Sequence, residues 1–255
     1  MNTLVDVNVK LGHWPFRRVK DMHALLNDLD RFHIKRACVS SLSAVHYFNP
    51  QEGNLELADS LSNVTGRFIP LAVLAPNFRG WERDFDRCVR EMGMQGVILY
   101  PNYHQFSLSS PAVNELATGI IEYKLPLFIQ TGLEDPRRQF RRTIVPEVQP
   151  EEIGAFAAQY PDLTVIALGL KFGQPERVSP SIPKNLFFDI SNYERTGELE
   201  YAVGKFGVEK LLFGTNFPLF NIAANVLKLE RADISTEQKH FIAAGNAQRL
   251  FNLER

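Results

Sequence analysis

The chain has 255 residues, of which 45% are hydrophobic and 22% charged, and its net charge is −1. A balance this close to neutral gives no electrostatic reason to expect binding to nucleic acid or to an acidic membrane surface. No apolar run reaches the roughly 18 residues that are needed to span a bilayer. These properties exclude a membrane-spanning protein and are those of an ordinary globular protein.

The first residues, MNTLVDVNV, lack the basic start and long apolar run of a signal peptide, so we expect them to form a strand. Cys38 and Cys88 lie in an apolar and a helical pattern. This favours two free, buried thiols over a disulfide, and it indicates a cytoplasmic location.

Short apolar segments alternate with amphipathic segments along the whole sequence. The apolar segments are rich in Val, Ile, Leu or Phe and carry few alternating polar residues, which is typical of parallel strands covered on both faces. In chain order the predicted strands are residues 4–9, 37–42, 68–74, 96–100, 127–130, 165–168, 186–190 and 211–214.

Helical patterns lie between these segments. In residues 21–33, five apolar side chains fall on one face, and residues 81–92 and 111–122 behave similarly. A final helix is expected over residues 235–251, where Ser235 and Gln238 form a capping box.

About eight strand–helix units fill the length without a linker, so the pattern predicts an α/β protein built as a single (β/α)₈ TIM barrel domain, residues 1–255. The alternative is an open, doubly wound sheet. No strand is followed by the GxGxxG fingerprint, which disfavours dinucleotide binding.

In such a barrel, chemistry takes place at the C-terminal ends of the strands. Several predicted strands become polar at that end. The polar residues there are Asp6, Asn8, Lys10, Ser41, Ser43, Asn102, Tyr103, His104, Gln130, Asp189, Ser191, Asn192 and Asn216.

Five segments, in the right order, resemble the amidohydrolase-related family of metal-dependent hydrolases and decarboxylases. LVDVNVKLG is similar to the opening D-x-H-x-H of that family, and YKLPLFIQTG to its fifth-strand LP-apolar-H-T-G. YPDLTVIALGL is similar to the sixth-strand P-D-L-apolar-H, and KLLFGTNFP to the eighth-strand L-L-F-G-S-D-Y-P. AAGNAQRLFNL resembles the closing helix N-A-x-R-L-F. The resemblance therefore runs from the first strand to the last helix.

The resemblance implies a metal held by histidines and an aspartate, but each of these positions carries another residue. The first-strand histidines correspond to Asn8 and Lys10, the fifth-strand histidine to Gln130, the sixth-strand histidine to Gly169 or the adjacent Leu170, and the eighth-strand aspartate to Asn216. Zinc sites use imidazole, thiolate or carboxylate ligands. We therefore expect no catalytic zinc, manganese or iron in the usual place, and no other cofactor. The activation of water by a metal does not transfer to this chain.

Each residue that stands at a metal-ligand position of the family allows two interpretations. The amides Asn8, Gln130 and Asn216 could bind substrate or fill an obsolete site. Lys10 could be a base or nucleophile with a lowered pKa, or it could form a salt bridge with Asp6 or Asp189. If both point inward, Asp189 and Lys10 could form an acid/base pair.

Three residues lie in loops over the predicted barrel mouth. His104 fits a general acid or base, or a surface histidine. Trp14 is expected to pack over the mouth, and Arg17 could clamp a carboxylate. The arginine-rich segment DPRRQFRR, residues 135–142, is either an anion-attracting loop or a solvated one.

Two function classes follow, and whether the chain is an enzyme stays open. One is a metal-independent hydrolase or lyase acting on a small carboxylated molecule. In it, Lys10, His104 and Asp189 are the predicted catalytic residues, and the predicted substrate contacts are Asn8, Gln130, Asn216, Arg17 and Trp14. The other is a non-catalytic binding protein, or a subunit of a homo-oligomer, that kept the fold.

Overall fold

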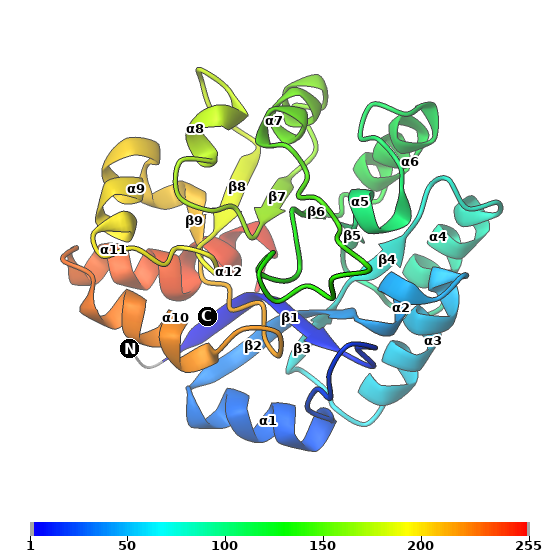
Figure 1. Cartoon of the computed structure of the whole chain (residues 1–255), viewed down its shortest axis with the longest axis horizontal. Coiled ribbons are helices and arrows are strands. Elements are labelled where there is room, and N and C mark those ends of the chain that lie inside the picture. Colours follow the sequence, from blue (N-terminus) through cyan, green and yellow to red (C-terminus); the bar gives the residue numbers. More distant parts are fainter. Residues whose placement is uncertain (1–2, 254–255) are drawn as a thin grey trace.

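The computed structural model describes residues 3–253 (Figure 1). Its parallel strands lie in the interior, and helices surround them. The strands are β1 (Leu4–Leu11), β2 (Ile34–Ser41), β3 (Phe68–Pro70), β4 (Ala72–Leu74), β5 (Val97–Leu99), β6 (Leu127–Gln130), β7 (Val165–Leu168), β8 (Leu186–Asp189) and β9 (Leu211–Leu212). Each overlaps a predicted strand, β1 and β2 extend beyond theirs, and β6 and β7 match their predicted bounds.

The strands follow their order in the sequence around a barrel. Backbone hydrogen bonds pair neighbouring strands within two runs, one from β1 through β3 and one from β4 through β9, and every pair is parallel. The predicted strand 68–74 is interrupted at Leu71, whose N–H donates to Val39 O at 2.9 Å. The ring closes where Val7 N donates to Phe213 O at 2.9 Å. The TIM barrel prediction is confirmed.

Helices follow most of the strands. They are α1 (Met22–Arg31), α2 (Ser43–His46), α3 (Pro50–Leu61), α4 (Trp81–Arg90), α5 (Pro101–His104), α6 (Pro111–Glu122), α7 (Pro150–Gln159), α8 (Pro175–Val178), α9 (Glu198–Phe206), α10 (Ile222–Arg231), α11 (Thr236–His240) and α12 (Asn246–Leu250). The Ser235–Gln238 capping box is present. The predicted final helix is one continuous segment whose middle, Phe241–Gly245, has π-helical hydrogen bonds.

Two apolar layers hold the barrel together, one inside the ring and one between the strands and the helices. Along β5, Val97 and Leu99 pack in the outer layer and Ile98 in the inner one, as the period of two requires. Cys38 and Cys88 are free and buried, as predicted. Within residues 3–253, no helix is long and apolar enough to cross a membrane.

Strand β1 changes face in its middle. Val5 and Val7 belong to the inner layer, whereas Val9 and Leu11 belong to the outer one. An irregularity in the pairing of β1 with β2, between Asp6 and Val9, accounts for the change. The side chains of Asn8, within the irregularity, and of Lys10, after it, therefore face the barrel interior.

Candidate functional site

Two polar side chains of β1 meet inside the barrel and reach a third on β8. Lys10 Nζ donates a hydrogen bond to Asn8 Oδ1 at 2.6 Å, and Asn8 Nδ2 donates to Asp189 Oδ2 at 2.8 Å. All three are buried, and Lys10 is only 1% exposed. An amide bridge thus connects the amine to the carboxylate.

The Asp189 carboxylate is held from a second side by backbone. Its Oδ1 accepts the N–H of Gly169 at 2.6 Å. A Cβ at Gly214 would lie 2.5 Å from Asp189 Oδ2, so glycine is needed there to leave room for the carboxylate. Asp189 therefore has a fixed position at the end of β8.

Burial has the largest influence on the pKa of the Lys10 amine. It lowers the pKa of Lys10 from 10.5 to about 7, and the negative charges of Asp189 and Asp6 oppose this shift. Lys10 can consequently be an amine or an ammonium near neutral pH.

Asp6 has a different environment. Burial raises its pKa from 3.8 to about 6, and hydrogen bonds from Thr215 oppose the rise. Thr215 Oγ1 donates to Asp6 Oδ2 at 2.5 Å, and Thr215 N donates to Oδ1 at 3.1 Å. These contacts join the first strand to the segment after β9, which supports a structural role for Asp6.

The space near the end of β7 is filled by a neighbouring amide. Gly169 has a φ of +79°, a left-handed conformation that favours glycine. A Cβ there would lie 3.0 Å from Gln130 Nε2 and 3.2 Å from Thr131 Oγ1. Gln130 Nε2 donates to Gly132 O at 2.9 Å. Gln130 therefore lies beside Gly169, in space that a larger side chain at position 169 would need.

Two further amides lie in the segments that follow β8 and β9. Asn216 Nδ2 donates to Leu133 O at 3.0 Å, and Asn192 Nδ2 donates to Gly169 O at 2.7 Å. Both side chains are buried. Asn192 was recognised in the sequence as a polar residue at a strand end, but nothing in the sequence singled it out as part of the site.

Aromatic side chains cover this end of the barrel. Trp14, in the loop after β1, is 2% exposed, and its ring centroid lies 4.7 Å from that of His46 and 6.4 Å from that of Tyr103. Phe16 stacks on Phe140 of the loop after β6, with centroids 5.6 Å apart. The prediction that Trp14 packs over the mouth agrees with this arrangement.

Arg17 holds loops of the cover together. Its Nη2 donates to Leu219 O at 2.8 Å and lies 3.5 Å from Glu134 Oε1. Arg17 thus connects the loops that follow β1, β6 and β9. Its guanidinium is partly exposed, so it could contact a ligand that enters from solvent.

His104 lies apart from this group. Its Nε2 is 3.2 Å from Ala44 O, and burial lowers its pKa to about 4. The ring of Tyr100 neighbours both residues, with its centroid 6.1 Å from the His104 centroid and 5.9 Å from Lys10 Nζ. This placement favours a structural role for His104 in joining α5 to α2.

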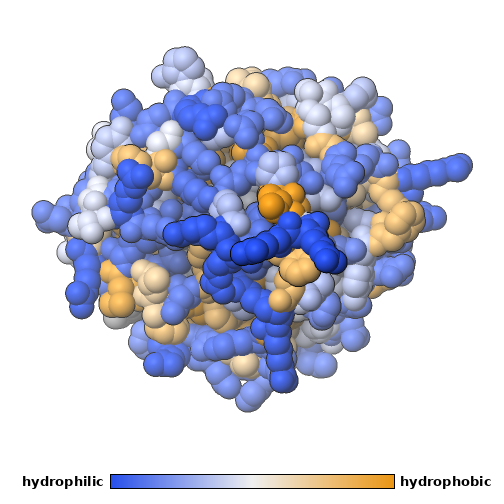
Figure 2. Space-filling model, viewed as in Figure 1, coloured by the Kyte–Doolittle hydropathy of each residue, from blue (hydrophilic) through white to orange (hydrophobic). Residues whose placement is uncertain are grey.

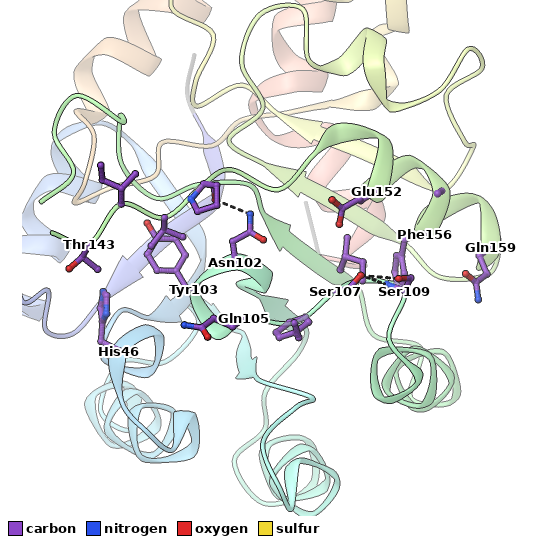
Figure 3. A pocket seen from close by; sticks show the side chains of 16 residues that line it. His46, Asn102, Tyr103, Gln105, Ser107, Ser109, Thr143, Glu152, Phe156 and Gln159 are labelled. Atoms are coloured by element: carbon purple, nitrogen blue, oxygen red, sulfur yellow. Dashed lines mark hydrogen bonds between the residues drawn. The ribbon is translucent and has the colours of Figure 1, made fainter. Parts of the chain in front are cut away.

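A hollow of about 970 Å³ opens beside the aromatic cover (Figure 3). His46 and Tyr103 line it next to the cover, and Phe156 and Gln159 of α7 line its other end. Its polar groups are mainly amides and hydroxyls, with Glu152 as its carboxylate. Among the residues that the structure describes, no lysine or arginine side chain that would attract an anion lines the hollow.

A parallel barrel with polar side chains gathered at the C-terminal ends of its strands is the architecture in which barrel enzymes carry their active sites. The family model described as amidohydrolase matches residues 43–253, so the chain belongs to the amidohydrolase family. Among curated proteins, the comparison finds no match to this sequence.

Solved structures with the same fold include several decarboxylases. A dihydroxybenzoic acid decarboxylase from Polaromonas sp. JS666, with bound manganese and the inhibitor 2-nitroresorcinol, is 18% identical with a TM-score of 0.77, covering 100% of this chain and 98% of that one. A 2,6-dihydroxybenzoate decarboxylase from Rhizobium is 17% identical with a TM-score of 0.77, covering 99% of both chains. A 5-carboxyvanillate decarboxylase from Sphingomonas paucimobilis is 15% identical with a TM-score of 0.76, covering 100% of both.

The residues of this barrel do not fit a manganese or zinc ion. Asn8 already uses both ends of its amide, and the Lys10 ammonium would repel a divalent cation. Gly169 offers no side chain, and the remaining candidates, Gln130 and Asn216, are neutral amides. Within residues 3–253, no group of three or more His, Cys, Asp or Glu side chains could hold a metal.

Proposed function

We propose that this protein is a lyase or hydrolase for a small carboxylated molecule, and that Lys10 takes the place of a divalent metal in its reaction. The observation that carries the proposal is the amine of Lys10, buried and connected through Asn8 to Asp189. Perturbed amines of this kind are typical of functional sites. The likeness to decarboxylase structures favours the lyase form of the reaction.

In the lyase reaction, Lys10 acts as the proton donor. The bond between the substrate carbon and its carboxylate breaks, CO₂ leaves, and the electron pair stays on the carbon. The Lys10 ammonium gives its proton to that carbon, and the amine regains a proton from water. Asn8 orients Nζ, and the pKa of about 7 makes both protonation states accessible at neutral pH.

Substrate must pass the aromatic cover to reach Lys10. Tyr103 lines the hollow of Figure 3, and the ring centroid of the buried Trp14 lies 6.4 Å from that of Tyr103 in the cover. We therefore propose that the loop after β1 moves during entry. Closure would then exclude water and strengthen the electrostatic influence of Lys10 on the carboxylate.

One observation favours a second candidate, a non-catalytic protein that kept the fold. Lys10, Gln130 and Asn216 are each at most 2% exposed, so the barrel end is closed to solvent. A network of amides around a buried lysine could serve stability alone.

A turnover assay separates the candidates. Protein treated with EDTA is incubated with 2,6-dihydroxybenzoate and 5-carboxyvanillate, and loss of the carboxylate is followed by NMR. We expect turnover that Lys10→Met abolishes and that Lys35→Met, a change at an exposed lysine, retains. Lys10 should also react faster with a small acylating reagent than Lys35 does.

Other results would count against the proposal. Turnover that requires added manganese and survives Lys10→Met would show that the reaction depends on a metal. Absence of turnover, with Lys10 acylated no faster than Lys35, would support the non-catalytic candidate.

A further inference from the structure

A second cavity lies beside the two helices that follow β8 and β9. It measures about 480 Å³, and two stretches of the chain line it. Residues 191–200 lead from the end of β8 into α9, and residues 220–232 lead from the segment after β9 through α10 (Figure 1). We call it the α9–α10 cavity. Among the residues that the structure describes, its wall includes none of Lys10, Asn8, Asp189, Gln130 and Asn216.

Two hydroxyl groups of this wall are buried and unpaired. Ser191 and Tyr193 line the cavity and are 3% and 2% exposed. Within residues 3–253, neither Ser191 Oγ nor the Tyr193 hydroxyl has a hydrogen-bond partner. Such atoms are uncommon, because leaving a buried polar group unpaired costs free energy. A hydroxyl can both donate and accept, so these two groups suit a ligand group that does both.

The amine of Lys228, in the same wall, already has its hydrogen bonds. Lys228 Nζ donates to Ile190 O at 2.6 Å and to Asn225 Oδ1 at 2.7 Å. Burial lowers the pKa of Lys228 to about 8, and the negative charge of nearby carboxylates, Asp189 foremost, opposes this shift. An anionic ligand would be repelled by these carboxylates, and a cationic ligand by the ammonium. The cavity therefore favours an uncharged ligand.

The other charged residues that line the cavity are exposed or already bonded. Glu194, Arg195 and Arg231 are exposed, so water and salt screen their charges. Glu200 Oε1 accepts the N–H of Asp233 at 2.7 Å. These side chains give the cavity no strong preference for either sign of charge.

Apolar side chains form the rest of the wall. Leu199 and Ala232 are buried, Phe220 is partly exposed, and Leu227 is 47% exposed. Hydrophobic residues also reach the surface on the side of the molecule where α10 lies (Figure 2). Apolar walls with a few polar groups are the usual composition of a site for a small molecule.

We propose that the α9–α10 cavity binds a small uncharged molecule with an apolar body and one hydroxyl group, which exchanges hydrogen bonds with Ser191 and Tyr193. The apolar body packs against Leu199 and Phe220. This site goes beyond the proposed reaction, whose substrate is an anion bound near Lys10.

Three fluorinated probes of similar shape test the proposal on the unmodified protein. At pH 7, 4-fluorophenol is uncharged and carries a hydroxyl, 4-fluoroanisole lacks the donor hydrogen, and 4-fluorobenzoate is an anion. Fluorine NMR titration measures the dissociation constant of each. We expect 4-fluorophenol to bind about 5-fold more tightly than 4-fluoroanisole and about 10-fold more tightly than 4-fluorobenzoate. No binding of 4-fluorophenol, or equal constants for it and 4-fluoroanisole, would overturn the inference.

Variants locate the bound probe. Ser191→Ala and Tyr193→Phe should each weaken binding of 4-fluorophenol by about 5-fold. Neither hydroxyl has a partner to lose, so urea unfolding should show no loss of stability. Leu227→Trp changes an exposed position of the wall, and it should fill the cavity and abolish binding. Tyr47→Phe is the matched control, because Tyr47 does not line the cavity and its hydroxyl donates to Glu56.

The barrel interior is the competing location for the probe. Lys10→Met should leave the binding of 4-fluorophenol unchanged if the probe occupies the α9–α10 cavity. Binding that Lys10→Met abolishes and Leu227→Trp retains would place the probe in the barrel and overturn the inference. Binding that is unchanged in both Ser191→Ala and Tyr193→Phe would also overturn it. None of these measurements requires turnover, so their outcome is independent of the lyase proposal.

Discussion

Gln130 Nε2 lies 3.0 Å from the point where a Cβ at position 169 would stand, so the conformation of one residue limits the identity of the other. By the sequence resemblance, position 169 or the adjacent 170 corresponds to one histidine of the family, and Gln130 to another. The left-handed φ of Gly169 adds a second restriction, because a side chain there would be strained even without Gln130.

We predict that Gly169→His destabilises the fold and does not create a metal site. The left-handed backbone costs about 1–2 kcal/mol, and displacement of Gln130 adds to this. Gly173→His is the matched control, since Gly173 has a φ of +78° with no atom within 4 Å of its Cβ position. Urea unfolding should show a larger loss for position 169 than for position 173. Equal losses of stability would mean that the Gln130 side chain can move aside without destabilising the fold.

Lys10 should make stability depend on pH between 7 and about 10. The folded-state pKa of about 7 lies below the ordinary 10.5, so the unfolded chain binds more protons in this interval. Stability of the unmodified protein should therefore rise with pH relative to Lys10→Met, by at most about 1.4 kcal/mol per pH unit. Urea unfolding of both proteins at pH 7 and pH 9 measures this difference. Parallel pH dependences would show that the Lys10 amine is not desolvated.

Arg17 should control access to Lys10. Its contacts with Leu219 O and Glu134 hold three loops of the cover, so Arg17→Gln should allow the cover to open more often. Mass spectrometry of Lys10 after brief exposure to an acylating reagent should show several-fold faster labelling. Arg18→Gln changes an exposed neighbour and should have no effect. Similar rates in all three proteins would exclude Arg17 from gating.

The hydroxyl of Thr215 should matter more at high pH than at low pH. It donates to Asp6 Oδ2 and favours the ionised carboxylate, whose pKa burial raises to about 6. Thr215→Val should cost roughly 1–3 kcal/mol at pH 8, where Asp6 is ionised, and less at pH 5. Unfolding of this variant and of Thr118→Val, which changes an exposed helix position, measures the difference. A loss independent of pH would contradict the assignment.

The barrel could be predicted because its strands are short apolar runs separated by amphipathic segments. β6 matches its predicted bounds, since Pro126 precedes it and a threonine and glycine follow it. The reversal of faces in β1 could not be predicted. It depends on the pairing between β1 and β2, which the identities of Asp6 and Asn8 do not specify.

The residues of the candidate site could be predicted, but the hydrogen bonds that connect them could not. The resemblance gave the positions of Asn8 and Gln130, and strand ends gave Asp189. The amide bridge between Lys10 and Asp189 could not be foreseen, because it joins two side chains of β1 to one of β8, a strand far away in the sequence. The direction of the His104 ring likewise follows from how α5 packs on α2, which local sequence does not encode. The catalytic and binding roles of these residues stay predictions.

The contact between Asp6 and Thr215 joins positions separated by 209 residues. A ribosome adding about 5–20 residues per second would take roughly 10–40 s to make the intervening chain. During that time Asp6 and its neighbours on the first strand have no partner from the last one, and they remain hydrated in the nascent chain. The polar residues of β1 that are buried in the finished barrel, Asp6, Asn8 and Lys10, are thus among the first residues made and among the last to be enclosed.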